Sequence, residues 1–136
     1  MVRDVNLAKE IVVTEKNKVG ILANISKILA DKDINIAAVA GYSENGNAKI
    51  MLVTDDNLRA VEALQKGGYK TVKESEAVLV DLINKTGALK NLTAKLASEG
   101  VSIKYIYGSQ CTGTCPGRLI LSTTNNEKTF IILKGK

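Results

Sequence analysis

The chain contains one stretch twice, and this repeat limits its fold more than any other feature. Residues 17–42 align with residues 84–109, and nine of the 26 aligned positions are identical. The match resumes after a two-residue insertion in the second copy, where residues 49–54 align with residues 118–123. Internal repetition of this kind indicates one structural unit built twice. We predict a first domain over 1–75, a second over 76–136, and a joint near 74–77.

The spacing of apolar residues predicts the order β-α-β-β-α-β within the first copy. Short β-branched runs indicate strands, apolar residues recurring every three or four positions indicate a helix, and alternation indicates a half-buried strand. A continuous apolar run favours a strand that is central in its sheet or covered on both faces. The predicted elements are strands at 10–15, 34–40, 49–54 and 70–74, helices at 20–32 and 58–67, and a hairpin turn at 44–47.

The second copy repeats this pattern but ends before its last strand. Strands are predicted at 77–82, 101–107 and 118–123, and a helix over 88–100. The stretch "TFIIL" at 129–133 has strand propensity, yet the repeat predicts a helix there. We predict two ferredoxin-like α+β units in tandem, with antiparallel sheets and helices on one face. A missing edge strand leaves backbone groups unpaired, so residues 1–9 or another subunit should cover that edge.

Composition narrows the class of function. The chain has 136 residues, of which 45% are apolar and 24% charged, which is typical of a soluble globular protein. No apolar run approaches the roughly 20 residues of a membrane span, and the N-terminus lacks the core of a signal peptide, so a cytoplasmic protein is expected. The net charge of +5 comes from scattered residues, and only four Tyr and one Phe are present. These features argue against nucleic-acid binding.

The repeated stretch resembles the signature of the ACT domain family. ACT units are βαββαβ modules that bind small effectors, usually amino acids, and their first loop reads Asp or Asn, variable, Pro, Gly, variable, Leu. Here "NKVGIL" at 17–22 and "DINIAA" at 33–38 match in order and spacing, as do "NKTGAL" at 84–89 and "EGVSIKY" at 99–105. Val19 and Thr86 replace the loop proline, and Ser102 stands where the first copy has Asn35. The resemblance is closest to small stand-alone tandem ACT proteins.

The resemblance implies an effector held at the strand–helix loops, at the interface of ACT units paired side by side. A helix N-terminus attracts a carboxylate, and an Asn side chain can both donate and accept hydrogen bonds, which suits an α-amino acid. Asn35 is expected to lie near the same turn as Asn17, and the first copy is favoured because it keeps both. The candidate ligand-binding residues are Asn17, Lys18, Val19, Gly20, Ile21, Leu22, Asn35, Ile36, Asn84, Thr86, Gly87, Ala88, Leu89, Ser102 and Ile103.

A purely structural interpretation of these residues stays open. Asn before a helix is often only a cap, and Gly there is often only a turn residue. We expect Gly20 and Gly87 to allow close backbone approach. The apolar residues Ile21, Leu22, Ile25, Leu89 and Leu92 are more simply explained as core.

The insertion in the second copy carries both cysteines, Cys111 and Cys115. Two thiols this close can form a disulfide, although a cytoplasmic setting argues against a permanent one. A structural zinc site needs about four ligands. The chain has no His, so two chains meeting at a two-fold axis would have to supply four thiolates. The alternative is a glycine-rich hairpin in which small thiols only fill space.

We predict a regulatory protein that binds an amino acid and reports its level, and not an enzyme. Carboxylates at 55–56 and 74–76 are better explained as helix caps and a solvated joint. The alternatives are a redox- or metal-responsive module using Cys111 and Cys115, or a ligand-free regulatory subunit of a metabolic enzyme or transporter. No cofactor is expected. A homodimer is expected, because each copy alone is marginal in size.

Overall fold

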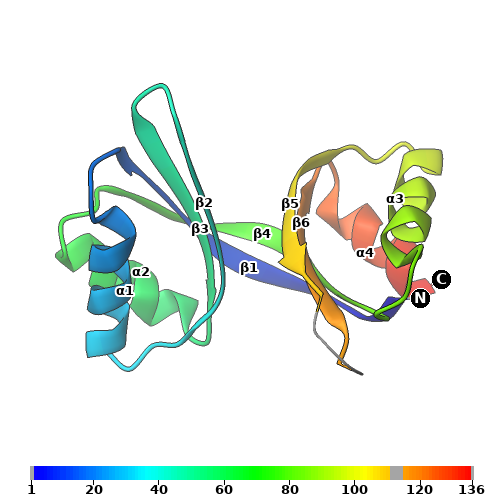
Figure 1. Cartoon of the computed structure of the whole chain (residues 1–136), viewed down its shortest axis with the longest axis horizontal. Helices are drawn as coiled ribbons and strands as arrows, with labels where there is room; N and C mark the ends of the chain where they lie inside the picture. The colour runs from blue at the N-terminus through cyan, green and yellow to red at the C-terminus, as the bar shows by residue number, and fades with distance from the viewer. Residues whose placement is uncertain (1, 111–114, 136) are drawn as a thin grey trace. The chain divides into compact units, whose positions relative to one another are not determined.

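The computed structural model describes residues 2–110 and 115–135, and its helices and strands follow the predicted order (Figure 1). Residues 129–133, "TFIIL", lie in a helix, as the repeat predicts, although their β-branched residues favour a strand. The elements are β1 (Val2–Lys16), α1 (Ile21–Asp31), β2 (Ile36–Glu44), β3 (Asn47–Thr54), α2 (Asn57–Lys66), β4 (Thr71–Leu82), α3 (Ala88–Ser98), β5 (Ile103–Ser109), β6 (Gly117–Thr123) and α4 (Asn126–Gly135).

The chain divides into two compact units. The first unit comprises residues 9–75, and the second comprises residues 1–8 together with 76–136. Hydrogen-bonded strands follow the order β2-β3-β1-β4-β6-β5. β3 pairs antiparallel with both β1 and β2, and β6 pairs antiparallel with both β4 and β5. The first unit therefore uses the end of β1 and the beginning of β4, whereas the second uses the beginning of β1 and the end of β4.

Each of the two long strands contributes to both units. β1 has 15 residues and β4 has 12, which is longer than the ordinary strand of about 5–6 residues. Residues 2–8 of β1 supply the edge strand that the second copy lacks, which agrees with the first of the two expected alternatives, residues 1–9 or another subunit. Val5 shows the fit, because its side chain is only 2% exposed within the core of the second unit.

The chain divides between residues 75 and 76, within the joint expected near 74–77, but this joint lies inside a strand and not in a loop. Residues 71–82 form one continuous strand, in which the charged residues Lys73, Glu74 and Glu76 are exposed and the apolar residues that follow are mostly buried. The sequence "KESE" has the composition of a solvated linker. Pairing with β1 nevertheless keeps this stretch extended, and strand pairing is a non-local interaction that composition does not report.

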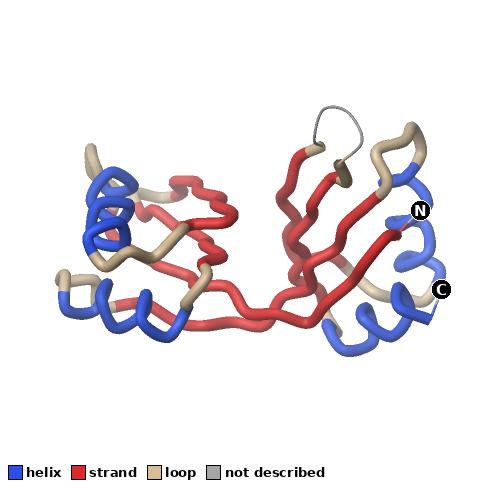
Figure 2. Tube along the Cα trace, turned by 90° about the horizontal axis from the view of Figure 1, so that it is seen from below, coloured by secondary structure: helices blue, strands red, loops and turns tan. Residues whose placement is uncertain are grey.

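Two helices cover one face of the strands in each unit (Figure 2). Residues every three or four positions along the helices point toward alternate residues of the strands, which places one apolar core under each helix pair. In the first unit the fully buried members include Ile11, Ile25, Leu29, Leu52 and Leu64. In the second unit the corresponding positions are Val78, Leu92, Leu96, Leu121 and Leu133.

Local turn chemistry ends the elements where the sequence predicts it. The β2–β3 hairpin turns at Asn45 and Gly46, both with positive φ, as a type I′ turn requires. Asp56 caps α2 by accepting a hydrogen bond from the backbone N–H of Arg59 at 3.1 Å. Gly67 follows the last turn of α2, and Gly100 follows α3 with φ 76°.

A repeated Thr-x-x-Asn motif fastens the second helix of each unit to a long strand. In the first unit the Asn57 side chain accepts from the backbone N–H and hydroxyl of Thr54, and it donates to the carbonyl of Lys9 at 2.9 Å. In the second unit Asn126 accepts from the same two groups of Thr123 and donates to the carbonyl of Glu76 at 3.2 Å. Lys9 and Glu76 are the first residues of β1 and β4 in their own units.

We predict that Asn57→Ala lowers the free energy of unfolding by about 1–3 kcal/mol, because it leaves a backbone N–H and a backbone carbonyl without their partner. Urea unfolding would measure this change. Leu58→Ala is the matched control, because the neighbouring Leu58 is 78% exposed and its loss should cost under about 0.5 kcal/mol. Equal effects of the two variants would contradict the fastening role.

A second prediction tests the shared strand. Val5→Ala should cost about 1–2 kcal/mol, because it removes buried apolar volume from the second unit. Hydrogen exchange should show faster exchange at the amides of residues 76–82, the neighbouring part of β4. Leu7→Ala on the same strand is the control, since Leu7 is 42% exposed. Unchanged exchange in Val5→Ala would mean that residues 2–8 do not support this unit.

Candidate functional site

A pocket of about 350 Å³ lies in the first unit between the loop after β1 and the hairpin of β2 and β3. The backbone N–H of Asn17 donates to the carbonyl of Gly46 at 2.8 Å, which ties the loop to the hairpin. Apolar side chains and several polar groups share the lining, a mixture typical of small-molecule pockets. The lining residues are Asn17, Leu22, Val39, Ala40, Gly41, Tyr42, Ser43, Ala48 and Ile50.

The second unit has a pocket at the equivalent place, with a volume of about 230 Å³. Leu89, Gly108 and Leu119 take the places of Leu22, Gly41 and Ile50, and Ser109 replaces Tyr42. The other lining residues are Leu82, Gln110 and Gly117. A side chain at position 108 would collide with the backbone carbonyl oxygen of Arg118, so the backbone here requires glycine. Both copies thus form a pocket at the same site, although its walls have diverged.

Both helices beside these pockets begin at a glycine. Gly20 has φ 90° and Gly87 has φ 91°, and neither α1 nor α3 has a side-chain cap at its N-terminus. Asn17 and Asn84 lie three residues before these glycines, in the loops that lead into the helices. A Cβ added at either glycine would meet no heavy atom within 4 Å, so positive φ, and not close backbone approach, requires glycine here.

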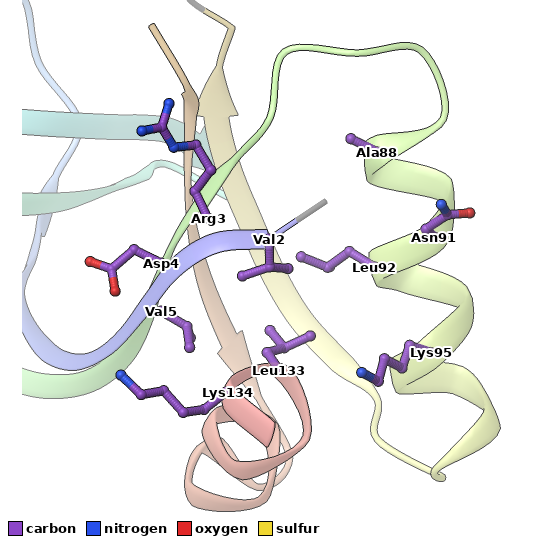
Figure 3. A pocket seen from close by; sticks show the side chains of 10 residues that line it. All are labelled: Val2, Arg3, Asp4, Val5, Ala88, Asn91, Leu92, Lys95, Leu133 and Lys134. Atoms are coloured by element: carbon purple, nitrogen blue, oxygen red, sulfur yellow. The ribbon is translucent and has the colours of Figure 1, made fainter. Parts of the chain in front are cut away.

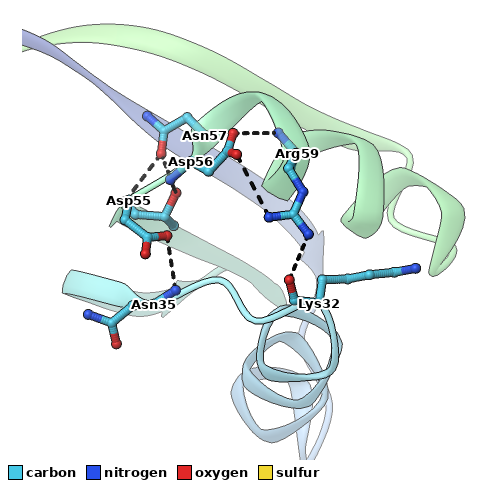
Figure 4. A network of polar contacts seen from close by, with 7 residues as sticks. Lys32, Asn35, Asp55, Asp56, Asn57 and Arg59 are labelled. Carbon is cyan, nitrogen blue, oxygen red and sulfur yellow. Dashed lines mark hydrogen bonds and ion pairs between the residues drawn. The ribbon is translucent and has the colours of Figure 1, made fainter.

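Asn35 does not lie near Asn17, so that expectation is wrong within one unit. β3 pairs with the last residue of β1 at one end and with Ile36 at the other, so the residue before Ile36 lies at the opposite end of the sheet. The 11 residues of α1, which span ~16 Å, separate the two asparagines. Asn35 instead exchanges two hydrogen bonds with Asp55: its N–H donates to the carboxylate, and its carbonyl accepts from the Asp55 N–H, both at 3.1 Å (Figure 4).

The second copy has the same arrangement. The N–H of Ser102 donates to the hydroxyl of Thr124 at 3.2 Å, and its carbonyl accepts from the Thr124 N–H at 2.9 Å. Ile36 and Ile103 follow these residues and pack half-buried against the cores of their units. The structure therefore separates the candidates into two groups, one at each end of each unit.

Candidates at the helix starts divide between core and surface. Ile21 and Ala88 are buried in the cores of their units, while Lys18, Val19 and Thr86 are exposed. Leu22 and Leu89 are 45% and 50% exposed, so the interpretation of these two leucines as core is wrong. They line the two pockets. Ile25 and Leu92 are buried as expected.

Several pocket residues were not predicted from the sequence. Tyr42 and Ser43 in the first unit, and Ser109 and Gln110 in the second, end their strands beside the hairpin turn. The identical pair Gly41 and Gly108 was a signal for this region, because glycine within a strand often marks a close approach.

One ion pair lies beside the second pocket. Arg118 donates to both carboxylate oxygens of Asp81, at 2.9 and 3.3 Å, across the β4–β6 register. This hydrogen bonding to Asp81 raises the pKa of Arg118 above its ordinary value. The pair holds the end of β4 beside Gly117, and both Leu82 and Gly117 line the pocket.

Comparison with known families identifies the chain. The family model described as "ACT domain pair" matches residues 7–136. The chain belongs to the ACT domain pair family. This assignment confirms the tandem ACT resemblance and the ferredoxin-like α+β fold, with an edge strand of the second ACT unit supplied by β1. No protein of curated function shows significant sequence similarity to the chain.

Solved structures with low sequence identity share the tandem ACT fold. Protein BT0572 from Bacteroides thetaiotaomicron superposes with a TM-score of 0.88 at 24% identity, over 96% of this chain and 89% of that one. The ligand-free regulatory subunit of aspartate kinase from Thermus thermophilus has a TM-score of 0.67 at 17% identity, over 99% and 98%. Aspartokinase alpha and beta subunits give 0.68 at 17% identity, over 99% and 97%.

Three further expectations from the sequence concern membrane spans, metal binding and the two cysteines. Among the described residues of this ACT pair, no helix has the length and apolarity that crossing a membrane demands. Nor does the described part of the chain contain a group of three or more potential metal-binding side chains. Cys111 lies outside the described residues, whereas Cys115 is disulfide-bonded.

The exposure of Leu22 leads to a prediction about stability. Leu22→Ala should change the free energy of unfolding of the first ACT unit by under about 0.5 kcal/mol, because the side chain is half exposed at the pocket. Ile25→Ala, one turn further along α1, should cost about 2–5 kcal/mol, since Ile25 is fully buried. Thermal or urea unfolding of both variants provides the measurement. Similar losses of stability in the two variants would mean that Leu22 is part of the core after all.

Proposed function

We propose that this ACT pair binds a free amino acid in the pocket beside α1 of the first unit and reports its level to a partner. One observation carries the proposal: the same pocket recurs in both copies, next to a helix that begins at a glycine without a side-chain cap. A turn that recurs in both copies would explain the two glycines, but it would not explain the two pockets. A recurring pocket lined by exposed leucines is better explained by a ligand.

The chemistry of the first pocket suits an α-amino acid. The N-terminus of α1 offers backbone N–H groups and a partial positive charge to a carboxylate. The exposed Asn17 amide and the Ser43 hydroxyl are able to accept hydrogen bonds from an ammonium group. Leu22 and Val39, both about half exposed, provide apolar surface for a side chain. A ligand of this size in an open pocket binds with roughly micromolar to millimolar affinity, which suits metabolite sensing.

Asn35 belongs to this proposal through a second copy of the chain. Within one unit α1 keeps Asn17 and Asn35 apart. Pairing of two copies would be able to bring the Asn17 end of one unit next to the Asn35 end of another. A homodimer would thus complete the site, and Ser102 would play the corresponding part for Asn84.

A regulatory role is supported by the fold relatives. Two of the solved structures named above are described as aspartate kinase chains, one of them a regulatory subunit. We propose by analogy that this chain acts on a metabolic enzyme and has no catalytic site of its own.

A thermal-shift screen against the common amino acids tests the proposal. A ligand that binds only the folded state raises the melting temperature as its concentration increases. One class of amino acid should raise it by several degrees at millimolar concentration, and Asn17→Ala should remove most of this shift. No shift with any amino acid in the unmodified protein would refute the sensor function.

Asn35→Ala separates the two versions of the site. Loss of the shift in both asparagine variants, together with a dimer in analytical ultracentrifugation, supports a site shared between copies. Loss in Asn17→Ala alone places the site within one unit. Asn6→Ala is the control, because the Asn6 side chain is exposed and donates only to nearby Asp4 at 3.0 Å among the bonds of the described residues.

A further inference from the structure

A third pocket, of about 430 Å³, lies in the second unit between β1, α3 and α4 (Figure 3). It is distinct from the pocket beside Leu89, with which it has no lining residue in common. Its apolar part is formed by Val2, Val5, Ala88, Leu92 and Leu133, of which all but Val2 are buried. Figure 3 shows the side chains of Val2, Leu92 and Leu133 converging on one space.

In the first unit, a tyrosine side chain fills the space that corresponds to this pocket. Tyr69, only 5% exposed, packs there in the core that contains Ile21, Ile25 and Leu64. Its backbone N–H donates to the carbonyl of Leu64, and its hydroxyl accepts a hydrogen bond from the Asn24 amide at 2.7 Å. The phenol ring therefore has a complete set of neighbours in the first unit.

Those neighbours correspond to the lining of the pocket in the second unit. The first-copy residues Ile21, Asn24, Ile25 and Ile28 align with Ala88, Asn91, Leu92 and Lys95, each 67 positions later. The starts of the helices, Asn57 and Asn126, are 69 apart, which aligns Leu64 with Leu133. Every one of these second-copy residues lines the pocket.

The same 67-residue offset relates the two long strands, so Tyr69 aligns with Val2 and Val72 with Val5. Burial supports this register, because Val72 and Val5 are both buried in their units. The pocket therefore arises from three replacements. Val2 lacks the phenol ring of Tyr69, Ala88 lacks most of the Ile21 side chain, and Lys95 places an ammonium where Ile28 is apolar.

The charges around the pocket add a second requirement. Arg3, Lys95 and Lys134 line it, against the single carboxylate of Asp4, which accepts from Asn6. Lys134 also lies over the Phe130 ring, with its Nζ 5.8 Å from the ring centroid. Lys95 is half-buried and extends from α3 toward Leu133 (Figure 3). The charged ends of Arg3 and Lys134 point away from Val2 and Leu133, so the Lys95 ammonium is the cation beside the apolar floor (Figure 3). A cation in this position favours an anionic ligand.

We propose that this pocket binds a small aromatic carboxylate whose ring takes the place that Tyr69 occupies in the first unit. The ring packs on Leu92 and Leu133, and the carboxylate pairs with Lys95. The site is separate from the proposed amino-acid pocket, and neither proposal depends on the other.

Amide chemical-shift mapping with 4-hydroxyphenylacetate as the probe tests the proposal in the unmodified protein. Shifts should saturate with concentration and concentrate at residues 2–5 and 88–95. The amide analogue, 4-hydroxyphenylacetamide, should bind at least threefold more weakly because it lacks the charge, and cyclohexylacetate should be weaker because it lacks the planar ring. Absence of saturable shifts at several millimolar, or shifts centred on residues 17–22, would overturn the proposal.

Variants that restore the first-copy residues provide the structural test. Val2→Tyr and Ala88→Ile should each fill the pocket, weaken the probe at least tenfold and keep or raise the melting temperature. Lys95→Gln should weaken the probe threefold to tenfold and remove the preference for the carboxylate over the amide. Asn17→Ala should change nothing. Unaltered affinity in a folded Ala88→Ile protein would sink the assignment even if the probe binds elsewhere on the chain.

Discussion

The pairing of β1 with β4 is the constraint on which both ACT units depend. A sheet edge leaves a row of unpaired N–H and C=O groups, and each unit covers its edge with the beginning of a long strand whose end belongs to the other unit. Residues 2–8 complete the second unit, and residues 71–75 complete the first. The repeat is therefore a βαββα segment with an extended first strand, and neither copy forms a full sheet by itself.

Local elements could be predicted because their signals are local. Helical spacing, the Asn45–Gly46 turn and the glycines after the helices each depend on a few neighbouring residues. The helix over the last ten residues was predictable only from the repeat, since its own propensity favours a strand. The long strands could not be predicted, because residues 74–76 resemble a linker in composition. Their extended backbone depends on pairing with residues far away in the sequence.

The candidate site was predicted in part for the same reason. A loop before each helix was predicted because Asn17, Gly20 and their second-copy equivalents recur in sequence, and the structure has a loop at both places. The position of Asn35 was not predicted. The helix that follows β1 runs back along the strands, so β2 begins at the end of the sheet opposite the end where β1 finishes. Leu22 matched the helical stripe yet lies at its exposed margin. Periodicity indicates which face of a helix is apolar, but it does not locate the border of the core.

Divergence between the copies is informative because the repeat supplies its own reference structure. The pockets beside Leu22 and Leu89 persist in both units, so they are retained features of the duplicated fold. At the place in the first unit that corresponds to the pocket at Val2, the side chain of Tyr69 is buried. Loss of the ring alone would have exposed apolar core at some cost in stability. Replacement of Ile28 by Lys95 at the same site changes the chemistry of the space as well as its size.

The shared strands also give a physical route from ligand binding to a response. Asn57 and Asn126 fasten the second helix of each unit to the carbonyls of Lys9 and Glu76, where each long strand enters its own unit. Opening of one unit would free part of a strand whose other part completes the other unit. We therefore expect their unfolding to be coupled, so that a ligand stabilising one unit lowers the population of open forms of both. Sharing of the two long strands would in this way transmit a change in stability from one ACT unit to the other.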